Sequence, residues 1–282
     1  MKTKTKIIAS LAIVVILLLA FFSFHHGQSK DITLGTIGDD EKIWNYIAKS
    51  KEAKDEGIHL KVKSFTDGVS LNKATAEGTV DVNAFQSYTY LVAYNDKNPK
   101  EQLSLLGTTY LEPMGIYSAK YHALDEIPDG GTIAIADNPA NTSRGLKLLA
   151  SAGLIELKSD FGPLSGTNAI KSNPHNFKFK EIDDTTGPRV IKDNDIDAVL
   201  IGNTIAQQGH LNVLKDSLYH EKVDQSTKDN VNILASAKDS KKKAEYKKLL
   251  KLYHSKDVQN YIKKQFGGTK VEVDKPVSYL QK

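Results

Sequence analysis

The residues best suited to chemistry lie in the polar segment DNPANTSRG, residues 137–145. An apolar run precedes this segment, and a helical pattern follows it. Asn141 is one of several residues there that can cap a helix, and free backbone N–H groups at a helix start favour an anion. The guanidinium of Arg144 can give a carboxylate two parallel hydrogen bonds. The pattern therefore predicts a carboxylate-binding site at Arg144 and Asn141. The alternative is that Arg144 lies on the surface and Asn141 only caps the helix.

Aromatic side chains form a second candidate group. Phe85 lies near the end of the strand-like run DVNAFQ, and Tyr88, Tyr90 and Tyr94 follow it. Some of them face a cleft in one interpretation, and all pack on a helix in the other.

Two asparagines form a third group. Asn203 follows the apolar run AVLIG, and Asn232 lies inside the apolar run VNILA. A buried amide without a hydrogen-bond partner costs about 1–3 kcal/mol. These amides therefore either bind a ligand or bond to the backbone.

Motifs of enzymes are missing from the sequence. It has no nucleophile elbow, phosphate loop, dinucleotide fingerprint or zinc-protease motif, and it has no cysteine. The histidines show no metal-ligand spacing with a carboxylate partner. We therefore expect no catalytic residue, no metal site and no cofactor.

The first 29 residues of the 282-residue chain read as a signal anchor and linker. Three lysines precede the uncharged apolar stretch Ile7–Phe24, which is long enough for a bilayer core. The residues around the possible cleavage sites suit signal peptidase poorly. We therefore expect an uncleaved anchor at the cell membrane, with the remainder of the chain on the extracytoplasmic face, or a secreted protein if cleavage occurs. After these lysines, basic and acidic residues are nearly equal in number, which argues against nucleic-acid binding.

Strand-like and helical patterns alternate from residue 30 onward. Apolar runs at 31–37, 58–65, 132–137 and 197–202 predict strands, and helical patterns lie between and after them. This order indicates an α/β fold with mostly parallel sheets in two lobes. Ligands of such folds bind at the carboxyl ends of strands and between domains.

Several segments in the same order together resemble the NlpA/MetQ family of substrate-binding proteins of ABC importers. They cover most of the chain after residue 30: FTDGVSLNKATAEGTVDVNAFQSYTYL, EPMGIYSAK, DNPANTSRGLKLLASAGLI, DAVLIGNTIAQQG and NVNILAS. The resemblance implies a two-lobed periplasmic-binding-protein fold of type II, with a ligand cleft between the lobes. Lobe 1 would comprise residues 30–117 and 236–282, and lobe 2 residues 118–235.

The resemblance also implies roles for individual residues. The arginine matching Arg144 holds the ligand carboxylate, and the asparagines matching Asn203 and Asn232 serve its polar end. Aromatic residues matching Phe65 and Phe85 wall the pocket. Together with the candidates above, the expected ligand-binding residues are Arg144, Asn141, Asn203, Asn232, Phe65, Phe85, Ser87 and Tyr88.

Gly68 and Ser87 depart from the family pattern, which usually has tyrosine and histidine there. The lipid-accepting cysteine is also missing. The expected function is to bind methionine, a related amino acid or a short peptide and to deliver it to an ABC permease and ATPase complex. The alternative is a surface protein that kept the fold but acts in adhesion or sensing. An anchored hydrolase would lack any nucleophile motif.

Overall fold

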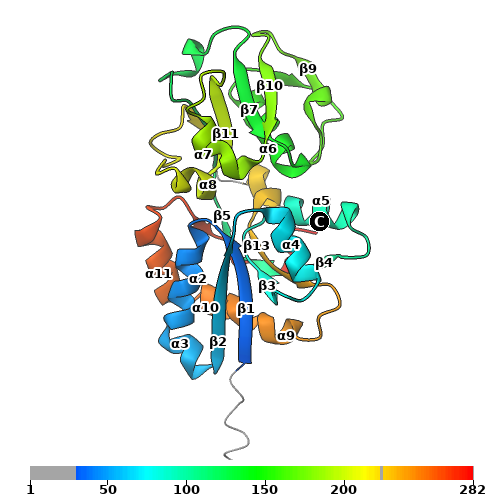
Figure 1. Ribbon diagram of the computed structural model, residues 1–282, viewed down its shortest axis with the longest axis vertical. Coiled ribbons are helices and arrows are strands. Elements are labelled where there is room, and N and C mark those ends of the chain that lie inside the picture. The colour runs from blue at the N-terminus through cyan, green and yellow to red at the C-terminus, as the bar shows by residue number, and fades with distance from the viewer. Residues whose placement is uncertain (1–29, 223–224, 282) are drawn as a thin grey trace, which may run out of the picture.

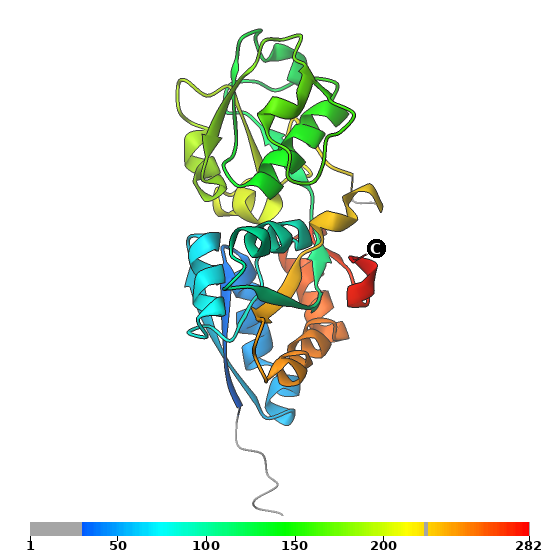
Figure 2. The same cartoon turned by 90° about the vertical axis from the view of Figure 1, so that its right-hand side faces the viewer.

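Two five-stranded sheets, stacked end to end along the long axis of the molecule, organise the chain (Figures 1 and 2). The computed structural model describes residues 30–222 and 225–281. The predicted anchor at residues 7–24 lies outside these ranges. Within them, no helix combines the length and apolar character needed to cross a bilayer. The predicted two-lobed α/β fold is confirmed, although both sheets are mixed rather than mostly parallel.

The first lobe is built on a sheet of order β2-β1-β3-β13-β4. Its strands are β1 (Lys30–Ile37), β2 (Ile58–Phe65), β3 (Val82–Asn83), β4 (Leu103–Thr108) and β13 (Ile233–Ala237). β1 pairs in parallel with β2 and β3, whereas β13 runs antiparallel to β3 and β4.

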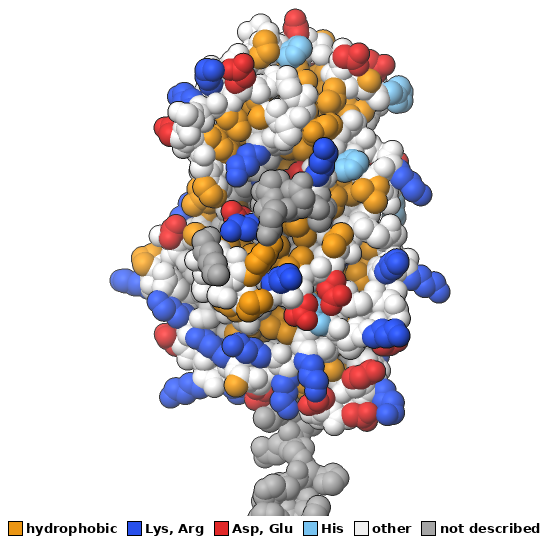
Figure 3. Space-filling model, turned by 180° about the vertical axis from the view of Figure 1, so that it is seen from behind, with side chains coloured by type: hydrophobic (Ala, Val, Ile, Leu, Met, Phe, Trp, Pro, Cys, Tyr) orange, Lys and Arg blue, Asp and Glu red, His pale blue; other side chains and the backbone are white. Residues whose placement is uncertain are grey.

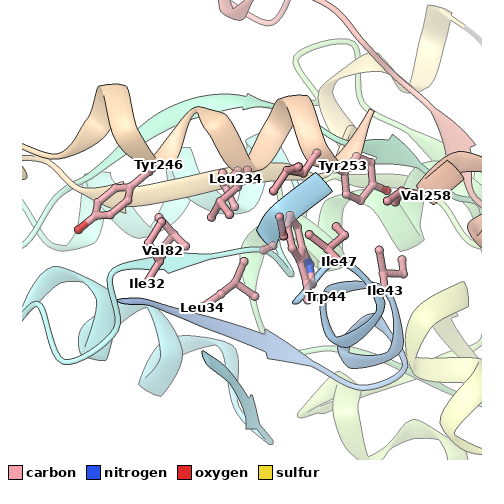
Figure 4. Packing of buried hydrophobic residues seen from close by; sticks show 14 of the residues in the cluster. Ile32, Leu34, Ile43, Trp44, Ile47, Val82, Leu234, Tyr246, Tyr253 and Val258 are labelled. Atoms are coloured by element: carbon pink, nitrogen blue, oxygen red, sulfur yellow. The ribbon is translucent and has the colours of Figure 1, made fainter. Parts of the chain in front are cut away.

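Helices cover both faces of this sheet (Figure 1). They are α2 (Asp40–Lys49), α3 (Lys51–Asp55), α4 (Gly68–Ala76), α5 (Tyr88–Lys97), α9 (Lys243–Tyr246), α10 (Lys248–Tyr253) and α11 (Lys256–Gln265). In the core, Trp44 of α2 meets Tyr253 of α10 at 5.5 Å between ring centroids, close to Leu34 of β1 (Figure 4). This packing holds α2 and α10 against β1.

The second lobe has a sheet of order β10-β7-β11-β6-β12. Its strands are β6 (Met114–Tyr117), β7 (Thr132–Ala136), β10 (Lys178–Ile182), β11 (Ala198–Gly202) and β12 (Tyr219–His220). Its helices are α6 (Pro139–Ser151), α7 (Gly187–Val190) and α8 (Asn203–Gln208). Two small sheets pair β5 (Tyr110–Leu111) with β14 (Val271–Glu272), and β8 (Glu156–Leu157) with β9 (Ile170–Ser172).

The lobe boundaries differ from those expected from the sequence. Residues 114–117 form β6, which pairs with β11 of the second lobe, and residues 233–237 form β13 of the first lobe. The chain therefore crosses between lobes at residues 112–113 and again between β12 and β13, rather than after residues 117 and 235. The reason is that a short apolar run does not reveal which sheet it joins, since pairing is decided by tertiary contacts.

Basic side chains do not gather in one patch on the face shown in Figure 3. They are spread over the first lobe and interspersed with acidic side chains. This distribution agrees with the near balance of charge in the sequence.

Candidate functional site: a cavity between the lobes

A cavity of about 90 Å³ lies between the two lobes and is lined by residues of both. The first lobe contributes Ile37 at the end of β1 and Gly68 at the start of α4. The second lobe contributes Asp184, just after β10, and Gly202 at the end of β11. The carboxyl ends of strands from both sheets thus meet here, which is where ligands bind in α/β folds.

Five of the eight residues expected to bind the ligand line this cavity. They are Arg144, Asn141, Asn232, Phe85 and Ser87.

The other three do not line it. Asn203 is fully buried and donates to Glu112 Oε2 and Thr269 Oγ1, each at 3.0 Å. Phe65 packs against a small apolar cluster that includes Ile37, and Tyr88 packs against an apolar cluster of the first lobe. Their contact with a ligand stays a prediction.

Helix α6 carries Arg144 and Asn141, but it begins earlier than the sequence suggested. Pro139 is its first residue, and the side chain of Asn138 caps it by accepting from the Asn141 backbone N–H at 2.9 Å. Proline is well suited to this position because its fixed φ is helical and it has no N–H to leave unpaired. Arg144 consequently lies in the second turn, not the first, and the free N–H groups of the helix start are not its direct neighbours.

The guanidinium of Arg144 is already paired within the chain. Its Nε donates to Glu221 Oε1 at 2.9 Å, and its Nη2 donates to Glu221 Oε2 at 2.5 Å. Nη2 also donates to the backbone oxygen of Glu112 at 2.7 Å. Arg144 and Glu221 are 8% and 9% exposed, so this is a buried ion pair. The two parallel hydrogen bonds predicted for a ligand carboxylate are therefore made to Glu221, and among the described residues Nη1 has no hydrogen-bond partner.

The charge of Arg144 is nevertheless secure. Burial lowers the pKa of the guanidinium, but the carboxylate of Glu221 more than offsets this, and the pKa is raised overall. Glu221 is itself fixed, because Oε2 accepts from the Met114 backbone N–H at 2.8 Å. Arg144 is thus a rigid, permanent cation at the cavity wall.

A second buried charge cluster lies beside the crossing at residues 112–113. Lys270 is fully buried and pairs with Glu112 at 2.6 Å and with Asp40 at 2.9 Å. Glu112 also accepts from the backbone N–H of Thr204 at 3.0 Å. The hydroxyl of Tyr110 donates to Asp40. We call these residues, with Asn203, the hinge cluster; it joins both lobes to the crossing between them.

The loop between β3 and α5 is held by buried amides. Gln86 exchanges hydrogen bonds with Asn72 at 2.8 and 3.0 Å and donates to Asn83 at 2.8 Å. This network fixes the two flanking residues, so that Phe85 and Ser87 both face the cavity. The Ser87 hydroxyl is engaged as the cap of α5, accepting from the Tyr90 N–H at 3.2 Å.

Gly68 lies directly under two aromatic side chains. A Cβ at this position would stand 2.7 Å from both Phe85 Cε2 and the Tyr90 hydroxyl, closer than atoms can pack. The Phe85 and Tyr90 rings meet edge to face at 5.6 Å. The space that a larger side chain would fill at residue 68 is thus occupied by Phe85 and Tyr90.

Three acidic residues important to the site were missed by sequence reasoning: Glu112, Glu221 and Asp184. Each is distant in sequence from its partner, so no local pattern indicated the pairing. The sequence signal that could have revealed them is an acidic residue close to the end of a predicted strand. Among the described residues, no group of histidine and acidic side chains is arranged to hold a metal ion.

The fold defines the class of protein: a two-lobed substrate-binding protein, here with a cavity between its lobes. Residues 32–273 match the NlpA lipoprotein family. The chain is 37% identical over 223 residues to the methionine-binding lipoprotein MetQ of Bacillus subtilis, covering 78% of this chain and 80% of that one.

Solved structures agree with this assignment. The substrate-binding protein of a methionine transporter from Streptococcus pneumoniae has a TM-score of 0.78 and 36% identity, covering 88% of this chain and 98% of that one. A nutrient-binding protein from Burkholderia cenocepacia bound to methionine has a TM-score of 0.77 and 33% identity, covering 86% and 99%. The chain belongs to the NlpA lipoprotein family of substrate-binding proteins, which are not enzymes.

Proposed function

We propose that this protein binds one amino acid, methionine or a close relative, between its lobes and delivers it to the membrane complex of an ABC importer. The observation that carries the proposal is Arg144, a buried cation on the wall of the inter-lobe cavity. The relatives named as methionine-binding proteins support the ligand class. They also support an ABC transporter as the partner.

The cavity is small, at about 90 Å³. We favour a single amino acid over a dipeptide, entering when the lobes separate and held when they close. Phe85 and Tyr90 form the aromatic wall that faces an apolar side chain.

Location outside the cytoplasm forms part of the proposal. The relatives include proteins named as lipoproteins and a periplasmic substrate-binding protein from Coxiella burnetii. This chain has no cysteine to accept a lipid. We propose that the apolar stretch at residues 7–24 anchors it to the membrane instead.

Calorimetric titration of the purified full chain with D- and L-amino acids tests the proposal. We expect methionine or a related amino acid to bind, and Arg144→Ala to weaken its binding at least ten-fold, since a ligand carboxylate loses its cation. Arg189→Ala is the matched control, because Arg189 is exposed on α7, away from the cavity. An Arg144→Ala variant with unchanged affinity would disprove the site, and a folded wild type that binds no amino acid would disprove the function.

A further inference from the structure

Helix α8 of the second lobe lies at the junction of the lobes and contacts the first lobe (Figure 1). Its Ile205 packs against the small first-lobe cluster that includes Ile37, and also against an apolar cluster of its own lobe. Gly38, which follows β1, lies against the same helix, since a Cβ there would stand 2.4 Å from Gln208 Nε2. One short helix thus connects the apolar packing of the two lobes.

The hydroxyl of Thr269 receives two hydrogen bonds from this helix. Its oxygen accepts from Asn203 Nδ2 at 3.0 Å and from Gln207 Nε2 at 3.3 Å, and it donates its own proton to the backbone oxygen of Phe266 at 2.8 Å. Thr269 is 1% exposed. The full set of hydrogen bonds to this buried hydroxyl therefore exists only while α8 lies against it.

The side chains that receive α8 belong to the first lobe. Lys270 donates to Thr204 Oγ1 at 2.5 Å, besides forming the ion pairs of the hinge cluster. Thr269 and Lys270 connect α11, which packs in the first-lobe core, to β14, which pairs with β5. Helix α8, in contrast, directly follows β11 of the second-lobe sheet. These hydrogen bonds therefore join one lobe to the other.

The contact at α8 also carries a cost. Asn203 Oδ1 and Gln207 Oε1 are buried there without a hydrogen-bond partner among the described residues. A buried carbonyl oxygen without a partner is unfavourable, and water would satisfy both oxygens if the lobes separated. Apolar packing and hydrogen bonds thus favour the contact, and two unpaired oxygens oppose it. Such a balance suits a contact that forms and breaks.

We propose that α8, Thr269 and Lys270 form a latch, which holds the lobes together in the absence of ligand and so sets the affinity of the cavity. Thr204 and Ile205 of α8 also line the cavity, so latch and ligand favour the same arrangement of the lobes. Ligand binds more weakly when a smaller fraction of the protein has the competent arrangement. The effect on affinity rests on the proposed function, whereas the effect on the distance between the lobes does not.

The distance between spin labels on the two lobes tests the latch without a ligand. Because the chain has no cysteine, Lys54→Cys on α3 and Ser159→Cys in the second lobe provide two unique labelling sites, and both residues are exposed. Pulsed electron spin resonance measures the distance in the labelled full chain after dialysis has removed small molecules. The labelled protein is compared with its Thr269→Val and Thr269→Ser variants, of which only the second keeps the hydroxyl.

Two further variants make the test specific. Thr75→Val is the matched control, because Thr75 Oγ1 also donates to a backbone oxygen, that of Leu71, and accepts from an amide, that of Asn83, but within the first lobe alone. Ile205→Ala tests the latch from the second lobe. Ile205 is half-buried, so this variant leaves the buried hydroxyl of Thr269 unchanged and spares the fold.

We expect Thr269→Val and Ile205→Ala to lengthen the mean distance between the lobes, while Thr269→Ser and Thr75→Val keep it. Saturation with methionine, or with the amino acid that binds most tightly, should restore the shorter distance. Calorimetry should show affinity weakened about five-fold in Thr269→Val, because two buried hydrogen bonds between the lobes are lost.

An unchanged distance in folded Thr269→Val or folded Ile205→Ala would overturn the latch and would leave the proposed function standing. An equal lengthening in Thr75→Val would also overturn it, since any lost buried hydroxyl would then have the same effect. A longer distance with unchanged affinity would overturn the link between latch and affinity. A wild type that shows the expected distances but binds no amino acid would disprove the proposed function and not the latch.

Discussion

Two neighbouring groups of charged residues, the hinge cluster and the charged residues of the cavity, differ in how their charges are balanced. In the hinge cluster, Lys270 contacts both Asp40 and Glu112, and Thr204 also donates to Glu112, although the amide oxygen of Asn203 is buried without a hydrogen-bond partner among the described residues. At the cavity, Arg144 has one nitrogen without a partner among the described residues, and Asp184 has one such oxygen. Each carboxylate of the hinge cluster thus meets an opposite charge within the chain, whereas the carboxylate of Asp184 at the cavity is held by neutral amides. The comparison thus distinguishes charged groups that stabilise the fold from charged groups that can bind a ligand.

Breaking the hinge cluster should have the largest effect. Lys270→Met leaves Asp40 and Glu112 buried without their cation, and removing one partner of such a pair costs about 3–5 kcal/mol of stability. Chemical denaturation measures this loss. Lys263→Met, at an exposed site of α11, should change stability by less than ~0.5 kcal/mol. Equal stability of the Lys270 and Lys263 variants would mean that the hinge cluster is not structural.

Changing the partner of Arg144 should alter affinity more than stability. Glu221→Gln keeps one acceptor oxygen, which can still serve Arg144 Nη2 and the Met114 N–H, and removes the competing negative charge. A ligand carboxylate then becomes the counter-ion of the guanidinium, so we expect amino-acid binding to tighten several-fold in calorimetry. Weaker binding in this variant would show that Glu221 mainly positions Arg144, and would refute its role as a competitor.

The aromatic wall allows a smaller perturbation that involves no charge. Gly68→Ala places a methyl group 2.7 Å from Phe85 and from the Tyr90 hydroxyl, which must shift toward the cavity. We expect amino-acid affinity to fall a few-fold. Gly162→Ala is the control, because its added Cβ would meet nothing nearer than 4.0 Å. If both variants bind like the wild type, the aromatic wall does not contact the ligand.

The smallest effect concerns the stability of the empty protein. Burial raises the pKa of Asp184, Asn141 and Asn138 lower it in part, and Asp183 and Asp137 raise it again. Because the folded protein holds this proton more tightly than the unfolded chain, stability is full below the ordinary pKa of 3.8 and is lost as pH rises through the folded value. Asp184→Asn removes that loss. The variant should therefore melt at a higher temperature than wild type at neutral pH, with the gap closing below pH 3.8; a lower melting temperature at neutral pH would argue against an unbalanced carboxylate.

The sequence predicts those parts of the fold that depend on local patterns. Alternation located β2, and apolar runs located β1, β7 and β11. The helical pattern between the first two strands forms two helices, α2 and α3, because Ser50 adopts an extended conformation and caps the second.

The candidate site was predictable only in part. Arg144 was found because a polar loop before a helix is a local signal, and the resemblance to a family supported it. Glu221 was not found, although it takes most of the donors of Arg144, because it lies 77 residues further along the chain. Asp184 was missed for the same reason, since only the packing of β10 beside α6 brings it to Asn141. Local sequence thus indicates which side chains can bind, but the fold decides which remain open.

Mass spectrometry of small molecules released on denaturing the purified full chain tests the central claim most directly. The account predicts an amino acid, methionine or a relative, in near-equal amount to the wild-type protein and strongly reduced in Arg144→Ala. Equal recovery from both proteins would contradict the assignment of Arg144. A released molecule without an amine, bound tightly again on titration, would contradict the claim that the cavity is an amino-acid site.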